Sequence, residues 1–347
     1  MEVVIGRSVI GMARQSYGAW HLDEQGSQAF SSWTSRTQTA PGAPGNKSPV
    51  RHLLYRVSGA QGMLHVAGLL AMMIHAACLQ AGDAATRTVA SMSALSPMGQ
   101  PGRWQLLFSD EFDGSSLDRG KWVTCYWWNN NGCTNLGNRE LQWYRPQNVT
   151  VGGGLLHLGA RRERVRGHEG AYYDYTSGLV STGRDVEDLG RAPRFAFQYG
   201  YVEMRARVPA GRGLFPAFWM LPITHEPKPE IDVMEVIGQE PGILHTYFHY
   251  RDADGVERRR GADSRTVDLS AGWHVFAADW QPGRIIWYLD GVERWRYQDA
   301  HDVPDEPMYL LVNLAVGGKW PGPPDNSTRL PAELLVDYVR VWRRIDR

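Results

Sequence analysis

The chain has 347 residues, of which 43% are hydrophobic and 21% are charged, with 37 basic and 37 acidic side chains. This balance gives no general attraction to nucleic acid or to an acidic membrane surface, so we expect no nucleic-acid partner. The composition also excludes a collagen, a coiled coil and a disulfide-dense miniprotein. The 38 Gly and 14 Trp residues favour a β architecture in which some aromatic rings stack on flat ligands such as sugars.

The N-terminal part of the chain is predicted to be a targeting region that lies outside the folded domain. Residues 1–62 show neither a helical nor a strand period, and we interpret them as a disordered extension or as a segment upstream of the true start of translation. The apolar segment at 63–80 has the length of a signal-peptide core and is short for a membrane span. The residues around Cys78 resemble a lipoprotein cleavage site, which would place a lipid on Cys78. The alternatives are a plain signal peptide and a single membrane anchor. Residues 81–102 are predicted to be a linker.

Two further cysteines bear on the compartment. Export by any of these routes would leave the protein secreted or in the cell envelope. Cys125 and Cys133 lie eight residues apart, and in an oxidising compartment they would close a short loop as a disulfide. Two free thiols are the alternative, and no spacing of Cys and His suggests zinc.

Residues 103–347 are predicted to form one all-β domain. Short runs of alternating apolar and polar residues, separated by turn signals, occur at 154–163, 200–211, 273–283, 284–297 and 334–344. Asp290-Gly291 marks a hairpin between two of them. No segment has a long amphipathic helical pattern, and no phosphate-binding loop, nucleophile elbow or HExxH motif occurs. Many short strands without βαβ spacing predict an antiparallel sandwich or jelly roll.

Three acids lie within six residues in the segment 229–238. On a helix, Glu230, Asp232 and Glu235 would diverge around the axis. On a regular strand, Glu235 would face away from the other two. A β-bulge that absorbs Val233 or Met234 returns Glu235 to the shared face, and we therefore predict a bulge in this strand.

Such a set of acids suits glycoside hydrolysis. Like charges on one strand face destabilise a protein unless they are solvated, paired or partly protonated. In a retaining glycosidase one carboxylate attacks the anomeric carbon and a second carboxyl, ~5–5.5 Å away, protonates the leaving oxygen. From spacing alone, a solvated acidic edge or a calcium site is the alternative, although calcium ligands usually come from loops.

The segment EIDVME followed by Gly238 resembles the signature of glycoside hydrolase family 16, in the bulged form typical of laminarinases (endo-1,3-β-glucanases). The resemblance extends over about 104–345 and includes FSDEFDG (108–114), NRELQWY (138–144), YGYVEMRARVPAGRGLFPAFWMLP (199–222), HTYFHY (245–250), MYLLVNLAVGGKWPG (308–322) and LLVDYVRVW (334–342). It implies a β-jelly roll of two curved antiparallel sheets with a concave cleft. It also implies a secreted, retaining endo-β-glucanase acting on β-1,3 or mixed β-1,3/1,4 glucan.

The same resemblance assigns roles to residues. It implies Glu230 as the nucleophile, Glu235 as the acid/base, and Asp232 as the group that tunes the pair. His249 matches a family histidine near the acid/base. Further positions expected to border or contact the sugar are Asn138, Glu140, Arg205, Phe215 and Trp219. No cofactor is required, but many members bind a structural calcium, for which Glu111 and Asp337 are the candidates.

Three departures from the family pattern border the expected cleft. Phe215 replaces a Trp, the segment 223–229 lacks a Trp-Pro pair, and Lys319 replaces an Asn. The acids are intact, so these departures concern the substrate. A galactan hydrolase of agarase or carrageenase type, a transglycosylase and a non-catalytic glucan-binding module are the alternatives. A polysaccharide partner and a monomer are expected, with membrane attachment only through the Cys78 lipid or the N-terminal segment.

Overall fold

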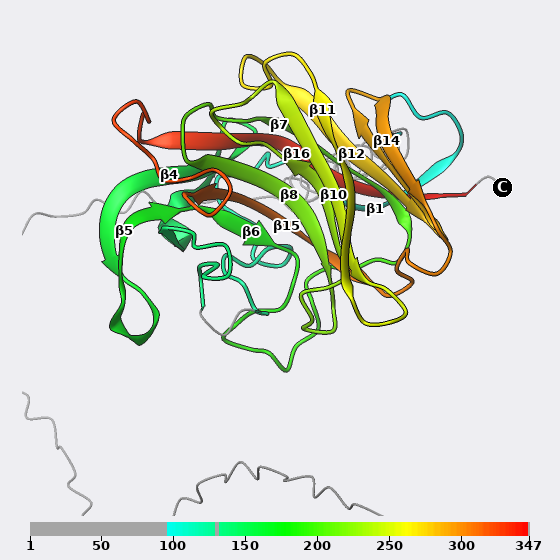
Figure 1. Ribbon diagram of the computed structural model, residues 1–347, viewed down its shortest axis with the longest axis horizontal. Helices are drawn as coiled ribbons and strands as arrows, with labels where there is room; N and C mark the ends of the chain where they lie inside the picture. The colour runs from blue at the N-terminus through cyan, green and yellow to red at the C-terminus, as the bar shows by residue number, and fades with distance from the viewer. Residues whose placement is uncertain (1–95, 129–131, 346–347) are drawn as a thin grey trace, which may run out of the picture. The chain divides into compact units, whose positions relative to one another are not determined.

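The computed structural model describes residues 96–128 and 132–345. The predictions for 1–62, the apolar segment at 63–80, Cys78 and residues 81–95 lie outside these residues. Two short 3-10 helices, η1 (Pro146–Asn148) and η2 (His168–Gly170), are the only helices in the described part of the chain. No helix there is long and apolar enough to cross a membrane. The rest consists of strands and their connections, as the all-β prediction requires (Figure 1).

The larger sheet has ten strands. They are β1 (Trp104–Asp110), β2 (Gln142–Tyr144), β3 (Val149–Gly152), β4 (Leu155–Arg166), β5 (Tyr172–Ser177), β7 (Gly200–Arg207), β12 (His274–Gln281), β13 (Arg284–Leu289), β14 (Val292–Gln298) and β16 (Ala332–Arg344). They follow the order β14-β13-β12-β7-β16-β4-β5-β2, while β1 pairs with β16 and β3 pairs with β4. The neighbours are antiparallel except β2 and β5.

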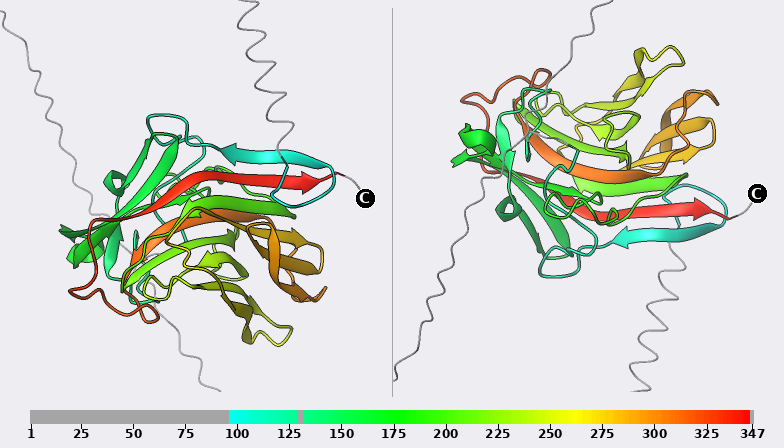
Figure 2. Two further views of the ribbon diagram at one scale, coloured as in Figure 1. Left: turned by 90° about the horizontal axis from the view of Figure 1, so that it is seen from above. Right: turned by 90° about the horizontal axis from the view of Figure 1, so that it is seen from below.

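The smaller sheet carries the site. Its strands are β6 (Leu179–Ser181), β8 (Leu214–Pro222), β9 (Glu230–Glu235), β10 (Ile243–Arg251), β11 (Glu257–Arg265) and β15 (Met308–Val316). They are antiparallel and follow the order β11-β10-β9-β8-β15-β6. The two views of Figure 2 show strands that curve in the same sense and stack as two layers. This is the predicted sandwich of two curved sheets.

The main hydrophobic core fills the space between the sheets. Alternate residues of a strand face opposite sides, and β15 shows this although all nine of its residues are buried. Leu310 and Val312 belong to the core between the sheets, whereas Tyr309 and Leu311 belong to a second apolar cluster on the other face of the smaller sheet. The second cluster lies under the cleft described below, which explains why this strand is apolar on both faces, with Asn313 as its one polar residue.

Two further features match or refine the sequence predictions. The hairpin between β13 and β14 turns at Asp290 and Gly291, with φ angles of 52° and 75°, as a primed turn requires. The last residues of the predicted linker, from 96 onward, lie against the larger sheet. There, the Met98 backbone N–H donates to Glu203 Oε2 at 3.0 Å, so the folded domain begins before residue 103.

Candidate active site

The bulge predicted in the acidic segment is present in β9. Two successive residues of β8 pair with Met234 and Asp232, which leaves Val233 without a partner of its own. The Val233 side chain is buried in the core between the sheets. The extra residue returns Glu235 to the face that carries Glu230 and Asp232, and all three acids line one cleft. The local conformation inferred from the spacing of the acids is therefore confirmed.

The cleft lies on the face of the smaller sheet that is turned away from the larger one, and has a volume of about 320 Å³. Its floor consists of residues from β8, β9, β10 and β15, and its walls include Tyr126, Trp128, Asn135, Asn138 and the connection at 317–321. The predicted site residues that line it are Asn138, Glu140, Phe215, Trp219, Glu230, Asp232, Glu235 and His249. A cleft that combines aromatic rings with convergent polar and charged groups suits a polar ligand such as a sugar.

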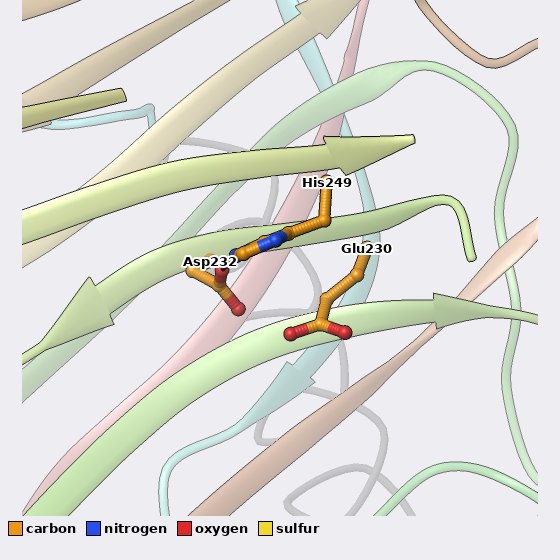
Figure 3. Close-up of side chains that lie close together, drawn as sticks. All are labelled: Glu230, Asp232 and His249. Atoms are coloured by element: carbon orange, nitrogen blue, oxygen red, sulfur yellow. Dashed lines mark ion pairs between the residues drawn. The ribbon is translucent and has the colours of Figure 1, made fainter. Parts of the chain in front are cut away.

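Asp232 occupies the centre of the acidic group. It is 2% exposed, and His249 Nε2 on the neighbouring strand lies 3.2 Å from its Oδ2. Figure 3 shows the His249 ring directed toward Asp232, with the Glu230 carboxylate beside it. From the core side, the Trp287 indole N–H donates to the Asp232 backbone carbonyl at 2.9 Å. This bond fixes the backbone next to the bulge.

Glu230 lies beside a cation. The Lys228 ammonium donates to Glu230 Oε2 at 3.0 Å, and both side chains are mostly buried. Burial and, next in size, the negative charge of Asp232 raise the pKa of Glu230 to about 7, while Lys228 and His249 act in the opposite direction. The ion pair thus favours the carboxylate form that a nucleophile needs.

Glu235 has a different environment. Burial raises the pKa of its carboxyl well above the usual range, the charges of Asp232 and Glu230 add to the increase, and Arg259 opposes it. No cation lies within ion-pair distance of Glu235 among the described residues, in contrast to Glu230. Glu235 therefore keeps its proton at neutral pH more readily than Glu230 does, and two carboxyls with such different environments can act as acid and as nucleophile.

A hydrogen-bond chain runs along one side of the cleft. The Trp219 indole N–H donates to Asn313 Oδ1 at 2.8 Å, and the Asn313 amide donates to the Tyr144 hydroxyl at 3.0 Å. Glu140 accepts from the Gln142 amide at 2.6 Å and from the Tyr144 hydroxyl at 3.5 Å. Burial raises the pKa of Glu140 to about 7. The chain fixes the orientation of the Trp219 ring and of a titratable carboxyl that can bond sugar hydroxyls.

The walls of the cleft carry aromatic rings. Trp320 is 43% exposed and packs edge-on against Phe215, with ring centroids 5.7 Å apart. The predicted disulfide between Cys125 and Cys133 is also present. It closes the loop that brings Tyr126 and Trp128 to the cleft. An exposed ring at such a position offers a face to the C–H groups of a pyranose.

Arg205 corrects the sequence analysis. It lies on β7 of the larger sheet, where Met204 and Ala206 on either side point into the core and Arg205 therefore points outward. Its guanidinium donates to Asp337 at 2.5 Å and lies over the Trp273 ring. The prediction that Arg205 contacts sugar in the cleft is wrong, because this residue is on the other sheet.

The residues expected to hold calcium are both paired with arginines. Arg340 donates to both oxygens of Glu111, at 2.8 and 2.6 Å, and Asp337 accepts from Arg205. Carboxylates engaged in this way are already neutralised, so the arrangement does not fit a cation at Glu111 and Asp337. Within the described part of the chain, the group that brings three ligand-type side chains within 4.8 Å is Glu230, Asp232 and His249, and all three line the cleft.

Several cleft residues were missed by the sequence analysis. They are Lys228, Arg259, Asn313 and Trp320. Asn313 had a detectable signal, because it is a polar residue inside the apolar run of β15 and a buried amide needs partners. Lys228 and Trp320 lie in connections, whose path the strand pattern does not fix.

Comparisons with known proteins agree with this geometry. Residues 173–338 match the sequence profile described as Glycosyl hydrolases family 16. The beta-glucanase of Rhodothermus marinus is 36% identical over 271 residues, which cover 70% of this chain and 86% of that protein. The chain belongs to glycosyl hydrolase family 16. It is therefore a glycoside hydrolase, and its two sheets are the jelly roll of that family.

Two further similar proteins show how far the match extends. Endo-1,3-1,4-beta-glycanase EglC of Rhizobium meliloti (strain 1021) is 36% identical over 250 residues, or 68% of this chain, and the match spans about half (51%) of that relative. The solved structure of the laminarinase from Rhodothermus marinus is 35% identical, with a TM-score of 0.59, and covers 71% of this chain and 100% of its own.

Proposed function

We propose that this family 16 enzyme is an exported, retaining endo-β-glucanase that cleaves β-1,3 or mixed β-1,3/1,4 glucan. The observation that carries the proposal is the bulge in β9, which brings Glu230, Asp232 and Glu235 into one cleft. The printed names of the relatives, a beta-glucanase and an endo-1,3-1,4-beta-glycanase, support the glucan class. The disulfide between Cys125 and Cys133 supports export.

In the first step, the Glu230 carboxylate attacks the anomeric carbon. The bond from that carbon to the glycosidic oxygen breaks, and this oxygen takes the proton of Glu235 as the leaving sugar departs. The Lys228 ion pair favours the ionised form of Glu230, while desolvation and the charges of Asp232 and Glu230 favour the protonated form of Glu235. The products of this step are a glycosyl ester on Glu230 and a carboxylate on Glu235.

In the second step, Glu235 acts as a base instead of an acid. Its carboxylate takes a proton from a water molecule, and the water oxygen attacks the anomeric carbon and releases Glu230. Two displacements on opposite faces of the sugar return the β configuration. A sugar hydroxyl in place of the water would give transglycosylation by the same chemistry.

Asp232 and His249 assist the nucleophile. The charge of Asp232 acts on both glutamates, and His249 at 3.2 Å limits its repulsion of Glu230. We assign Asp232 the role of adjusting the two carboxyls to their different protonation states during the cycle. The aromatic rings of the cleft, Trp219 and Trp320 among them, would bind the pyranose faces.

Azide rescue tests the assignment of the two glutamates. The substrate is an activated aryl β-glycoside of laminaribiose. With it, Glu230→Ala plus azide should yield the α-glycosyl azide, because azide replaces the nucleophile in a single displacement. Glu235→Ala plus azide should yield the β-glycosyl azide, because azide then intercepts the covalent intermediate. Proton NMR of the products reads the configuration directly. The reverse pattern would reject the assignment, and full activity of both variants without azide would reject catalysis by these acids.

A polysaccharide panel tests the substrate. Reducing-end release from laminarin, lichenan, agarose and carrageenan should be fastest with one of the two glucans. Intermediate-sized products at early times would show internal cleavage. Faster release from agarose or carrageenan would replace the glucan proposal with the galactan alternative, while the catalytic assignment would stand.

A further inference from the structure

His245 stands in one row with the proposed acid/base. It lies on β10, where it pairs directly with Glu235 of β9 on one side and with Asp263 of β11 on the other. Directly paired residues of antiparallel strands share a face, with Cβ atoms about 5 Å apart. Asp263, His245 and Glu235 therefore follow one another across three adjacent strands on the cleft side of the sheet.

The His245 ring is oriented by Asp263. Its Nδ1 lies 2.8 Å from Asp263 Oδ1, and the same carboxylate accepts a hydrogen bond from the Tyr247 hydroxyl. The Trp320 ring packs against His245 with centroids 4.6 Å apart and covers it from the cleft.

Nε2 of His245 has no hydrogen-bond partner among the described residues, although the residue is only 4% exposed. A buried nitrogen without a partner is rare and calls for an explanation. Its direct neighbour across the strand pair is a carboxyl that changes protonation in each half of the proposed reaction. When Glu235 reorients toward the substrate during the reaction, its carboxyl would become the hydrogen-bond partner of His245 Nε2.

We propose that the Asp263–His245 pair is a positioning device for Glu235, an inference that rests on the proposed function. With a proton on each ring nitrogen, both nitrogens donate. Nδ1–H bonds Asp263, and Nε2–H bonds one oxygen of Glu235. The other Glu235 oxygen then carries its proton toward the glycosidic oxygen. As that proton leaves, the Nε2–H bond strengthens because negative charge develops on Glu235.

Substrates that differ in their need for the acid test this proposal. In a 2,4-dinitrophenyl β-glycoside of laminaribiose, the dinitrophenolate departs without being protonated. In laminarin, the departing sugar oxygen must receive a proton from the acid. We expect His245→Phe, which keeps a ring against Trp320, to lower kcat/KM on laminarin about tenfold or more. On the aryl glycoside kcat/KM should stay within about threefold of the wild type. Glu235→Gln provides the reference pattern for complete loss of the acid.

A second variant covers the case in which His245→Phe does not fold. The Asp263 side chain is 58% exposed on an edge strand, so Asp263→Asn should fold and show the same selectivity in weaker form. Tyr247→Phe is the matched control, since it removes the other bond to Asp263 and should leave the ratio of the two substrates unchanged. Equal losses on both substrates, or no loss on laminarin, would overturn the inference. A wild-type enzyme without activity on any glucan would instead overturn the proposed function.

Discussion

Removing the cation beside the proposed nucleophile should move the acidic limb of the pH–activity profile to higher pH. Lys228→Met keeps the length of the side chain and removes the ammonium that lies 3.0 Å from Glu230. The lysine favours the charged form of Glu230, so its loss raises the pKa of that carboxyl. Because only the carboxylate can attack the sugar, activity should fall at neutral pH and recover at higher pH.

The structure sets the size of this shift. Both side chains of the pair are about one-fifth exposed, at 18% and 22%, so solvent screens the interaction only in part. A hydrogen bond between charged groups contributes about 1.5–3 kcal/mol, and one pKa unit corresponds to about 1.4 kcal/mol. The pKa of Glu230, about 7 with the lysine present, should therefore rise by about 1–2 units. The ionised fraction at neutral pH would fall about 5- to 50-fold.

The assay is kcat/KM on laminarin between about pH 5 and 9, where the acidic limb of the free enzyme reports the nucleophile. Lys319→Met is the matched control, because it removes a second lysine of the cleft that forms no ion pair within the described residues. Its acidic limb should coincide with that of the wild type. If the limb of Lys228→Met also coincides with the wild type to within about 0.3 pH unit, the pairing does not control the ionisation of Glu230.

Two further predictions concern the walls of the cleft. A methyl group at Gly261 would lie 2.1 Å from Tyr247 Cδ1, so Gly261→Ala should displace that ring and lower the unfolding free energy by about 1–3 kcal/mol. Gly152→Ala, with open space around the new methyl, is the control, and equal melting temperatures of the two variants would contradict the reasoning. Replacing Cys125 and Cys133 by Ser reopens a loop of eight-residue separation, which should cost about 2–3 kcal/mol. An unchanged denaturant midpoint would show that the disulfide does not stabilise the fold.

The local features of β9 could be predicted because each rested on a short-range rule. Side chains alternate along a strand, so three acids at these spacings share a face only if one residue is added. The apolar Val233 could take the added position, and it is buried as such a residue should be. The strands and the hairpin at Asp290 followed from the same alternation and from turn chemistry.

The features that were missed depend on which strands become neighbours. Alternation places Arg205 on the face of β7 opposite Met204, but it does not say that β7 belongs to the sheet without the cleft. The row of Asp263, His245 and Glu235 depends on the register of three strands, which no local pattern reveals. Gly261 contributes to this register, because only a residue without a Cβ leaves space for the Tyr247 ring.

The most direct test of the account is a crystal structure of the enzyme trapped with a 2-deoxy-2-fluoro laminaribiosyl inhibitor. The account predicts a covalent bond from the anomeric carbon to a Glu230 carboxylate oxygen, with the Glu235 carboxyl in the same cleft on the water-accessible side of that carbon. A bond to another residue would contradict it. So would a Glu235 side chain turned into the core between the two sheets.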